Sequence, residues 1–281
     1  MEYTNKLDLP SSLVETLKKH DSDYIATKSD EKFSATGLLN PPHQTKLLKF
    51  HGGKLTEDVS DRIWLLLGSA IHGILEAGET SEQLIEERFF ATVDGIKISG
   101  MIDVYSNGKI SDWKVTSVYT LDNVERLRKF EEQLNILAYL MRVNNFEVDK
   151  LEIVAILRDW GRRHAVKHPA QVETLNINLW SLEEQETFIK ERLALHLADD
   201  NEFCSMTDRW NKGDKFAVMK KGRKSAIRLH DTEAEAIARM EAEQEAKPKD
   251  KFYLEVRKGE NVRCLSYCPV AKFCEFGKSL I

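Results

Sequence analysis

The sequence predicts an α/β fold: a mixed central β-sheet flanked by helices, with a small ββαβ insert and a cysteine clasp near the C-terminus. Short runs of strand-forming residues surround the pairs Asp94-Gly95 and Asn107-Gly108, and such pairs favour two-residue hairpin turns. Apolar residues spaced three and four apart before and after these runs predict flanking helices. Three cysteines between residues 264 and 274 indicate a local metal site.

The composition is that of a globular chain without an overall basic charge. The 281 residues are 42% hydrophobic, enough for one large domain or for a core with an insertion. Charged residues make up 31% and the formal net charge is −5, so a DNA-binding surface would have to be local. The sequence lacks a signal-peptide pattern at its start and an apolar run of the roughly 18 residues that a membrane helix needs. We therefore expect a cytoplasmic protein with no membrane partner.

Residues 1–57 are predicted to form an N-terminal arm. A short amphipathic helix is expected over 11–20, followed by a polar link. Pro41 and Pro42 are expected to stop regular structure. The arm is therefore predicted to be irregular beyond its first helix.

A core is predicted over residues 58–203, and it begins with a helix that carries His72. A lone helical histidine is usually structural. However, His72 lies off the apolar stripe, Gly68 one turn earlier would let the helix approach a sheet closely, and a candidate metal site lies downstream. We therefore favour a metal-ligand role for His72. The apolar residues predicted to form the buried face of this helix are Ile63, Leu66, Leu67, Ala70, Ile71, Ile74 and Leu75.

The hairpin at Asn107-Gly108 is the most informative part of the core. Its register places Asp103 opposite Asp112, with the two Cβ atoms about 5 Å apart, where like charges destabilise a hairpin. Lys114 points to the same face as Asp112, and its positive charge could offset the repulsion between the two carboxylates. Two carboxylates at this spacing also suit a hard divalent cation such as Mg²⁺ or Mn²⁺. Solvated charges are the alternative, because most charged residues lie in solvent.

A second hairpin at Asp94-Gly95 extends the pattern to a three-stranded meander. The strand that carries Asp103 would lie in its centre. Glu86 or Glu87 would face Asp103, and the choice depends on a loop length that the sequence does not fix.

The rest of the core alternates helices and strands. A long helix is expected over 122–144, with Gln133 beside its apolar stripe. A strand over 151–157, an extended segment over 172–179 and a helix over 182–198 follow. Added to the meander, this order predicts a mixed sheet with helical flanks.

Residues 204–281 are predicted to hold a ββαβ insert, with strands over 215–221 and 224–230, a helix over 232–246 and a strand over 252–257. Charge runs are usually solvated, but a basic hairpin in an acidic chain is a candidate contact for a phosphate backbone. Its basic residues are Lys212, Lys215, Lys220, Lys221, Arg223, Lys224 and Arg228.

The four cysteines frame this insert. Cys204 precedes it, and Cys264, Cys268 and Cys274 follow it. Four thiolates satisfy either an iron–sulfur cluster or a structural zinc ion. The spacing differs from that of a zinc ribbon and favours the cluster, while free thiols are the alternative. Loss of one cysteine is expected to destabilise the C-terminal third.

Taken together, four motifs in order resemble those of the PD-(D/E)XK nuclease superfamily, in its RecB/Cas4-like branch. They are Gly68-x-x-x-His72, Gly100-x-x-Asp103, Asp112-x-Lys114 and Gln133. The C-terminal cysteines are similar to the iron–sulfur clasp of that branch. The segment over 33–37 and the basic hairpin look most like Cas4-like exonucleases of tailed phages. The resemblance implies a restriction-endonuclease-like core over 58–203.

The resemblance also implies roles for individual residues. His72, Asp103, Asp112 and the Val115 carbonyl would hold a divalent ion. Lys114 would orient or activate the attacking water, and Gln133 would brace the DNA or Lys114. Two positions depart from the family. Leu137 stands where the family usually has tyrosine, and Cys204 follows the core, although the first cysteine of the clasp usually precedes it. The fourth cluster ligand could therefore come from elsewhere.

The expected function is a metal-dependent DNA exonuclease that acts at ends or on single strands in phage DNA replication, recombination or degradation. DNA is the expected partner, with phage recombination or replication proteins and self-association as candidates. The expected cofactors are Mg²⁺ or Mn²⁺ and an iron–sulfur cluster or Zn²⁺. Two alternatives stay open: a structure-specific endonuclease, and a DNA-binding recruitment partner with a degenerate site.

Overall fold

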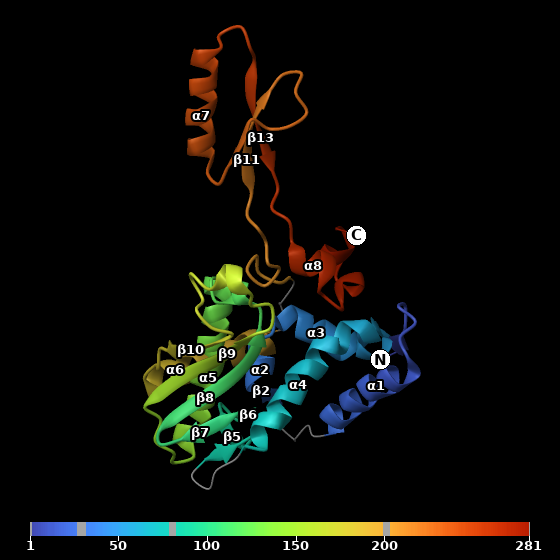
Figure 1. The fold of residues 1–281 in the computed structure, drawn as a ribbon, viewed down its shortest axis with the longest axis vertical. Helices are drawn as coiled ribbons and strands as arrows, with labels where there is room; N and C mark the ends of the chain where they lie inside the picture. The colour runs from blue at the N-terminus through green and yellow to red at the C-terminus, as the bar shows by residue number, and fades with distance from the viewer. Residues whose placement is uncertain (1, 27–31, 79–82, 199–202, 281) are drawn as a thin grey trace. The chain divides into compact units, whose positions relative to one another are not determined.

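The chain divides into two compact units, Met1–Asn201 and Glu202–Ile281 (Figure 1). The structure, a computed structural model, describes residues 2–26, 32–78, 83–198 and 203–280. The predicted α/β class is confirmed, because helices combine with sheets that contain both parallel and antiparallel pairs. Among the described residues, no helix is both long enough and apolar enough to cross a membrane.

A five-stranded mixed sheet lies at the centre of the first unit, with strand order β10-β9-β8-β7-β4. β8 runs parallel to β9, and the other neighbouring strands are antiparallel. The strands are β4 (Leu84–Ile85), β7 (Val104–Ser106), β8 (Lys109–Thr116), β9 (Lys150–Leu157) and β10 (Val172–Ile177).

Both predicted hairpin turns are present. Asp94 and Gly95 have φ values of 48° and 75°, and Asn107 and Gly108 have φ values of 49° and 76°. Positive φ at both central residues is what a two-residue turn of this kind requires. The register predicted around the second turn is confirmed by the pairs Ser106–Lys109, Tyr105–Ile110 and Val104–Ser111.

The prediction of a single three-stranded meander is wrong, because the chain bends and the predicted strands divide between two sheets. β5 (Arg88–Val93) and β6 (Ile96–Met101) form a separate sheet with β2 (Phe33–Ser34). At the bend, the Glu86 N–H donates to the Asp103 carbonyl over 3.1 Å, and Glu86 has a φ of 51°. Asp103 therefore lies just before a strand rather than at its centre.

The long helix α5 (Val124–Val143) is the main core helix of this unit, and every residue from Leu134 to Met141 is buried. It packs against β5, β6, β8 and β10 and against α6 (Leu182–Leu197). Gly100 allows β6 to approach this helix. A Cβ there would lie 2.4 Å from Leu137 Cδ2, so a larger residue would overpack the core.

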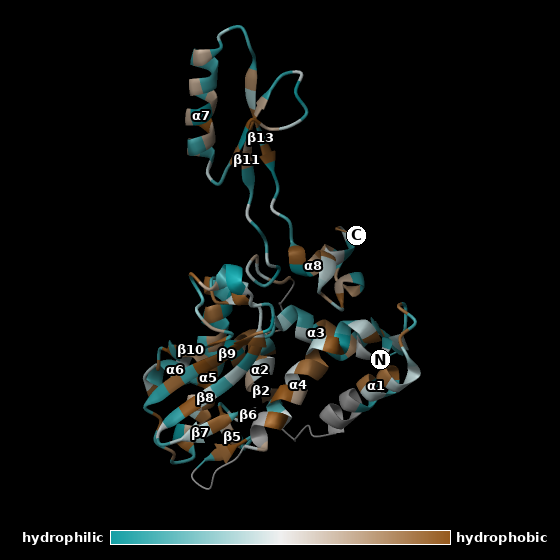
Figure 2. Cartoon of the chain, in the orientation of Figure 1, coloured by the Kyte–Doolittle hydropathy of each residue, from teal (hydrophilic) through white to brown (hydrophobic). Residues whose placement is uncertain are grey.

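The helix that carries His72, α4 (Ile63–Glu76), lies against β8 (Figure 1). The prediction of a buried face is wrong over residues 63–74, because none of them is fully buried, and the side chain of Leu75 lies outside those that the structure describes. Ile74 is 72% exposed and Trp64 is 57% exposed, and Figure 2 shows hydrophobic residues along the visible side of the helix. The core cluster of this unit is formed by other elements, chiefly α5 and the strands, so α4 remains at the surface.

The N-terminal segment is more regular than the predicted arm. Pro42 does not stop regular structure but begins α3 (Pro42–His51), because a helix needs no N–H donor in its first turn. The other elements of this segment are β1 (Glu2–Thr4), α1 (Ser11–Ala26), α2 (Ala35–Leu38), η1 (Gly52–Lys54), β3 (Thr56–Asp58) and η2 (Val59–Arg62).

The second unit contains the predicted ββαβ insert. Its strands form an antiparallel sheet in the order β12-β11-β13, and α7 packs on β11 and β13. Short helical segments follow, with Cys264 inside the first of them and Cys268 and Cys274 in the links between them. The elements are β11 (Lys215–Lys220), β12 (Arg228–His230), α7 (Glu233–Ala246), β13 (Phe252–Arg257), α8 (Val262–Ser266), η5 (Ala271–Phe273) and α9 (Glu275–Lys278).

Candidate active site

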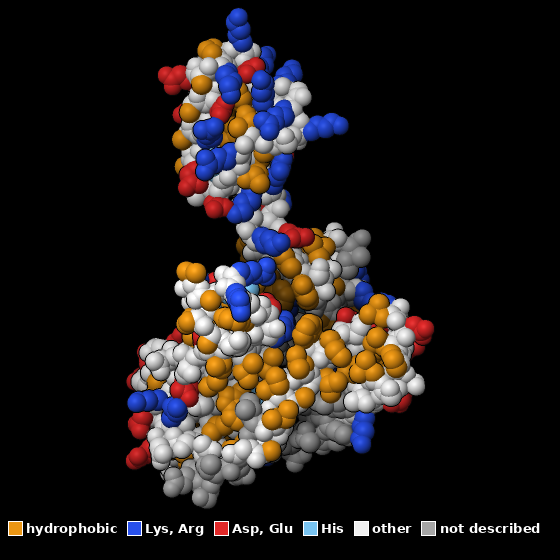
Figure 3. All heavy atoms as spheres, viewed as in Figure 1, with side chains coloured by type: hydrophobic (Ala, Val, Ile, Leu, Met, Phe, Trp, Pro, Cys, Tyr) orange, Lys and Arg blue, Asp and Glu red, His pale blue; other side chains and the backbone are white. Residues whose placement is uncertain are grey.

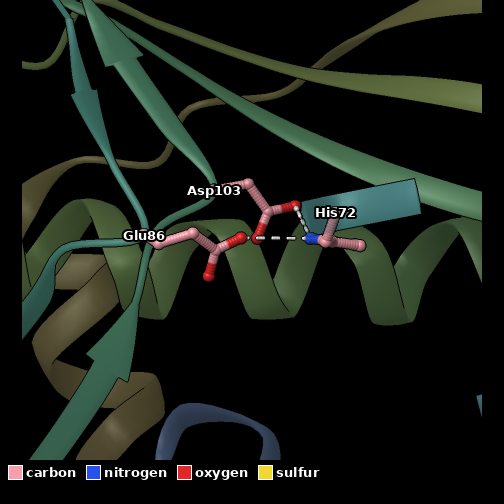
Figure 4. Close-up of side chains that lie close together, drawn as sticks. All are labelled: His72, Glu86 and Asp103. Carbon is pink, nitrogen blue, oxygen red and sulfur yellow. Dashed lines mark hydrogen bonds and ion pairs between the residues drawn. The ribbon is translucent and has the colours of Figure 1, made fainter. Parts of the chain in front are cut away.

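Three potential metal ligands converge at the bend between the two sheets (Figure 4). His72 Nδ1 lies 3.2 Å from Glu86 Oε1 and 3.8 Å from Asp103 Oδ2. One ligand atom from each residue lies within 4.8 Å of the other two. His72 comes from α4, Glu86 follows β4, and Asp103 precedes β7. Of the two glutamates that the sequence left open, Glu86 is the one that joins this group.

A second group of predicted residues lies on β8 and α5. Asp112 is only 1% exposed, and its Oδ1 accepts a hydrogen bond of 3.3 Å from Gln133 Nε2. Lys114 Nζ lies 2.6 Å from Asp112 Oδ2 and 5.9 Å from the centroid of the Phe130 ring. Within the described chain, Asp112 Oδ2 accepts no hydrogen bond, and the Lys114 ammonium is its ion-pair partner. This buried oxygen can therefore accept a further donor or cation.

Trp113 connects the two groups. Its backbone N–H donates to Asp103 Oδ2 over 2.7 Å, and its ring centroid lies 6.0 Å from that of His72. Successive side chains of a strand point to opposite faces. Trp113 therefore faces α4, while Asp112 and Lys114 face α5.

The predicted ligand set is thus only partly gathered. His72 and Asp103 lie together and are joined by Glu86, whereas Asp112 belongs to the neighbouring group with Lys114 and Gln133. Val115 lies in the parallel ladder opposite Ile156. The sequence left Glu86 and Glu87 open, and the break before β5, where Glu86 has a φ of 51°, determines which of them joins the site.

The electrostatics of the two groups are coupled. Burial and the nearby charge of Asp112 raise the pKa of Asp103 to about 7, and Lys114 opposes this rise. The hydrogen bond that His72 donates to the Glu86 carboxylate raises the pKa of His72 above its usual value. His72 and Asp103 therefore both bind a proton more tightly than usual, and a bound metal ion would have to displace it.

The donor set fits a hard divalent cation. Two carboxylates and one imidazole converge, and a buried carboxylate oxygen without a hydrogen bond lies in the next group. Mg²⁺ and Mn²⁺ prefer carboxylate oxygen, and Mn²⁺ also accepts imidazole. The residues that would hold the ion are His72, Glu86 and Asp103, with Asp112 adjacent.

The last three cysteines, Cys264, Cys268 and Cys274, influence one another's charge. All four cysteines are half-buried. Burial raises the pKa of the Cys264 thiol, and the neighbouring Cys268 and Cys274 raise it further. Next to Cys204, the Phe203 ring packs against Phe276 with 6.4 Å between centroids, so both ends of this unit meet. Among the described residues, however, only His72, Glu86 and Asp103 bring three ligand atoms within 4.8 Å of one another, so the structure does not gather the thiols at metal-binding distance.

Only part of the predicted basic hairpin is available for phosphate. Lys212, Lys215 and Lys220 form ion pairs with Glu260, Asp231 and Asp250. In the described structure, no such pair occupies the other four basic residues, which are exposed. They are Lys221, Arg223, Lys224 and Arg228. Blue side chains are numerous on this unit in Figure 3.

The comparisons with known proteins support the fold alone. No family description and no curated protein sequence matches the chain. Among solved structures, the crystal structure of SSO0001 is similar, with a TM-score of 0.50 and 16% sequence identity over 73% of this chain and 93% of that chain. At this identity the likeness concerns the α/β architecture and says nothing about chemistry.

Proposed function

We propose that the protein is a metal-dependent DNA exonuclease with a restriction-endonuclease-like core. The observation that carries the proposal is the convergence of His72, Glu86 and Asp103 within 4.8 Å, beside the Asp112–Lys114 pair. The order of these residues in the sequence resembles that of PD-(D/E)XK nucleases. Phosphodiester hydrolysis needs both a cation site and a nearby positive group, and this surface offers both.

Each residue has a distinct task in this proposal. When bound, Mg²⁺ or Mn²⁺ would lower the pKa of a water molecule and stabilise negative charge on the phosphate. Glu86 and Asp103 would hold the ion together with His72, whose Nδ1 lies 3.2 Å from Glu86 Oε1. Lys114 supplies a mobile positive charge beside the reacting phosphate. Gln133 holds Asp112 in place through its side-chain amide.

The proposal predicts metal-dependent digestion of linear DNA. Wild-type protein with Mn²⁺ or Mg²⁺ is expected to release nucleotides from 5′- or 3′-labelled linear strands, and EDTA should stop the release. Ca²⁺ should bind but support little turnover, because the reaction needs tighter coordination. Labels at the two ends also reveal the polarity. Asp112→Asn, which keeps the shape of the side chain but removes its charge, is the matched inactive variant.

Circular single-stranded DNA separates the proposed exonuclease from an endonuclease, since only an endonuclease cuts a substrate without ends. If wild type and Asp112→Asn digest no linear or circular DNA yet both bind it, the recruitment-partner alternative replaces the enzyme. The exposed residues Arg223, Lys224 and Arg228 of the basic hairpin would then carry binding.

We also propose an iron–sulfur cluster held by Cys264, Cys268 and Cys274, with Cys204 as the candidate fourth ligand. Protein purified without oxygen is expected to be coloured and to contain iron and sulfide. Cys268→Ala should lose the iron and lower the melting temperature, because metal binding contributes to folding of such small units. Colourless protein with stoichiometric zinc would replace the cluster with a structural zinc site.

A further inference from the structure

Beside the candidate active site, α4 presents an aromatic residue that packing does not explain. Trp64 is 57% exposed, although burying a tryptophan usually stabilises a fold. The guanidinium carbon of Arg158 lies 4.3 Å from the centroid of its ring. Arg158 thus covers one face of the indole, and a planar group can stack on the other.

Trp64 lies on the same helix as His72. The two residues are eight positions apart, which is roughly 12 Å along the helix axis. Between them, a Cβ at Gly68 would meet no other atom within 4 Å. The helix surface between the exposed indole and the candidate metal ligands is therefore uncrowded at Gly68.

Arg158 is placed by the sheet on the same side. It follows β9, and its N–H donates to the Thr116 carbonyl at the end of β8 over 3.0 Å. Residues 152, 154 and 156 of β9 are half-exposed, while 151, 153, 155 and 157 are buried. Arg158 continues the exposed series, so its side chain lies on the face that α5 leaves uncovered.

The surroundings of Arg158 favour a polyanion over an apolar partner. The next turn, η4 (Arg162–His164), carries Arg162 and Arg163, both exposed. In the ranges that the structure describes, no carboxylate forms an ion pair with these three arginines, and the neighbouring Asp159 accepts hydrogen bonds from Ser117 and Val118 instead. Tyr119, 62% exposed, packs edge-on against His164. Aromatic rings interleaved with unpaired arginines are typical of surfaces that bind single-stranded nucleic acid.

We infer that Trp64 and Arg158 form a stacking platform for an unpaired base of a DNA strand whose phosphates continue toward the His72 group. The inference rests on the proposed function, because it takes the ligand of that group to be DNA. Stacking requires an unpaired base, so the platform selects single strands or frayed ends over intact duplex.

The test is binding of fluorescent oligothymidylate of about twelve nucleotides in Ca²⁺, with gels confirming that the oligonucleotide stays intact. Trp64→Ala is expected to raise Kd about 5- to 150-fold, the range that corresponds to one lost base stack. Trp64→Phe should retain most of the affinity. Phe50→Ala, which removes another exposed aromatic side chain of the same unit, should leave Kd unchanged. Binding of a closed-ended duplex should not depend on Trp64.

Equal affinity of wild type and Trp64→Ala for oligothymidylate would overturn the platform. So would a dimer in sedimentation that Trp64→Ala dissociates without a change in Kd, since Trp64 would then contact a second copy. The outcome for the enzyme is separate. If wild type digests DNA with Mn²⁺ while Trp64→Ala binds normally, only the platform fails. If Trp64→Ala weakens binding but wild type digests nothing, only the proposed hydrolysis fails.

Discussion

Replacement of Lys114 with alanine is expected to lower the rate of DNA digestion about 10²- to 10³-fold, the usual cost of removing one preorganised group that stabilises transition-state charge. Its ammonium group lies 2.6 Å from Asp112 Oδ2, at the edge of the candidate metal site. Removal leaves no other lysine in that position. Binding of Mn²⁺ and of DNA should persist, because the proposed ligands and the basic hairpin remain.

A matched control lies on the same strand. Lys109 begins β8 and forms an ion pair of 2.8 Å with Glu152, so Lys109→Ala also removes one paired lysine of β8 but is expected to keep full activity. Because Lys114→Ala leaves Asp112 buried without its cation, thermal unfolding is measured alongside. Lys114→Arg keeps the positive charge but changes the shape of the side chain, so it distinguishes the effect of losing the charge from the effect of changing the shape. Full activity of a folded Lys114→Ala protein would contradict the proposed role.

The parts of the fold that sequence predicted well are those set by neighbours along the chain. Asn107-Gly108 dictates a tight turn because both residues accept positive φ, and the register of the following residues follows from that turn. The ββαβ order of the second unit was likewise predicted from local patterns. Pro42 shows the limit of such patterns, since proline either ends a helix or begins one, depending on where the helix starts.

The parts that sequence missed depend on what packs against what. Periodicity shows which residues of α4 share a face, but the helix lies at the surface because other elements, including α5, form the core cluster. Ile74, predicted to be buried, is therefore 72% exposed. Similarly, the position of Glu86 depends on a bend where the predicted meander divides between two sheets. Neither tertiary feature leaves a signal in residue spacing.

In the absence of metal, Asp103→Asn is expected to be more stable than wild type at about pH 8, and the difference should vanish near pH 4. Burial beside Asp112 raises the pKa of Asp103 to about 7 from an ordinary value of 3.8. Between these values the folded state keeps a proton that the unfolded state has lost, so the stability of wild type falls as pH rises. A raised His72 pKa acts in the same direction. The shift of Asp103 corresponds to an upper bound of about 4 kcal/mol.

Asparagine keeps the oxygen that accepts the Trp113 N–H bond and removes only the charge. Urea unfolding in EDTA at several pH values measures the effect. Asp159→Asn is the control of opposite sign. Hydrogen bonds from Ser117 and Val118 lower the pKa of Asp159, so its charge stabilises the folded state at pH values above the unfolded pKa. This stabilisation is lost as pH falls through the folded pKa.

Added Mn²⁺ should reverse the order of wild type and Asp103→Asn. Mn²⁺ would stabilise wild type more at pH 8 than at pH 6, since its binding displaces protons from Asp103 and His72, and it would stabilise Asp103→Asn little at either pH. A buried carboxylate that destabilises the metal-free fold near neutral pH is typical of a functional site, where the charge serves to bind a ligand and not to stabilise the folded state. If Asp103→Asn proved less stable than wild type at pH 8 in EDTA, Asp103 would be a structural carboxylate, and the cation site would lose its central ligand.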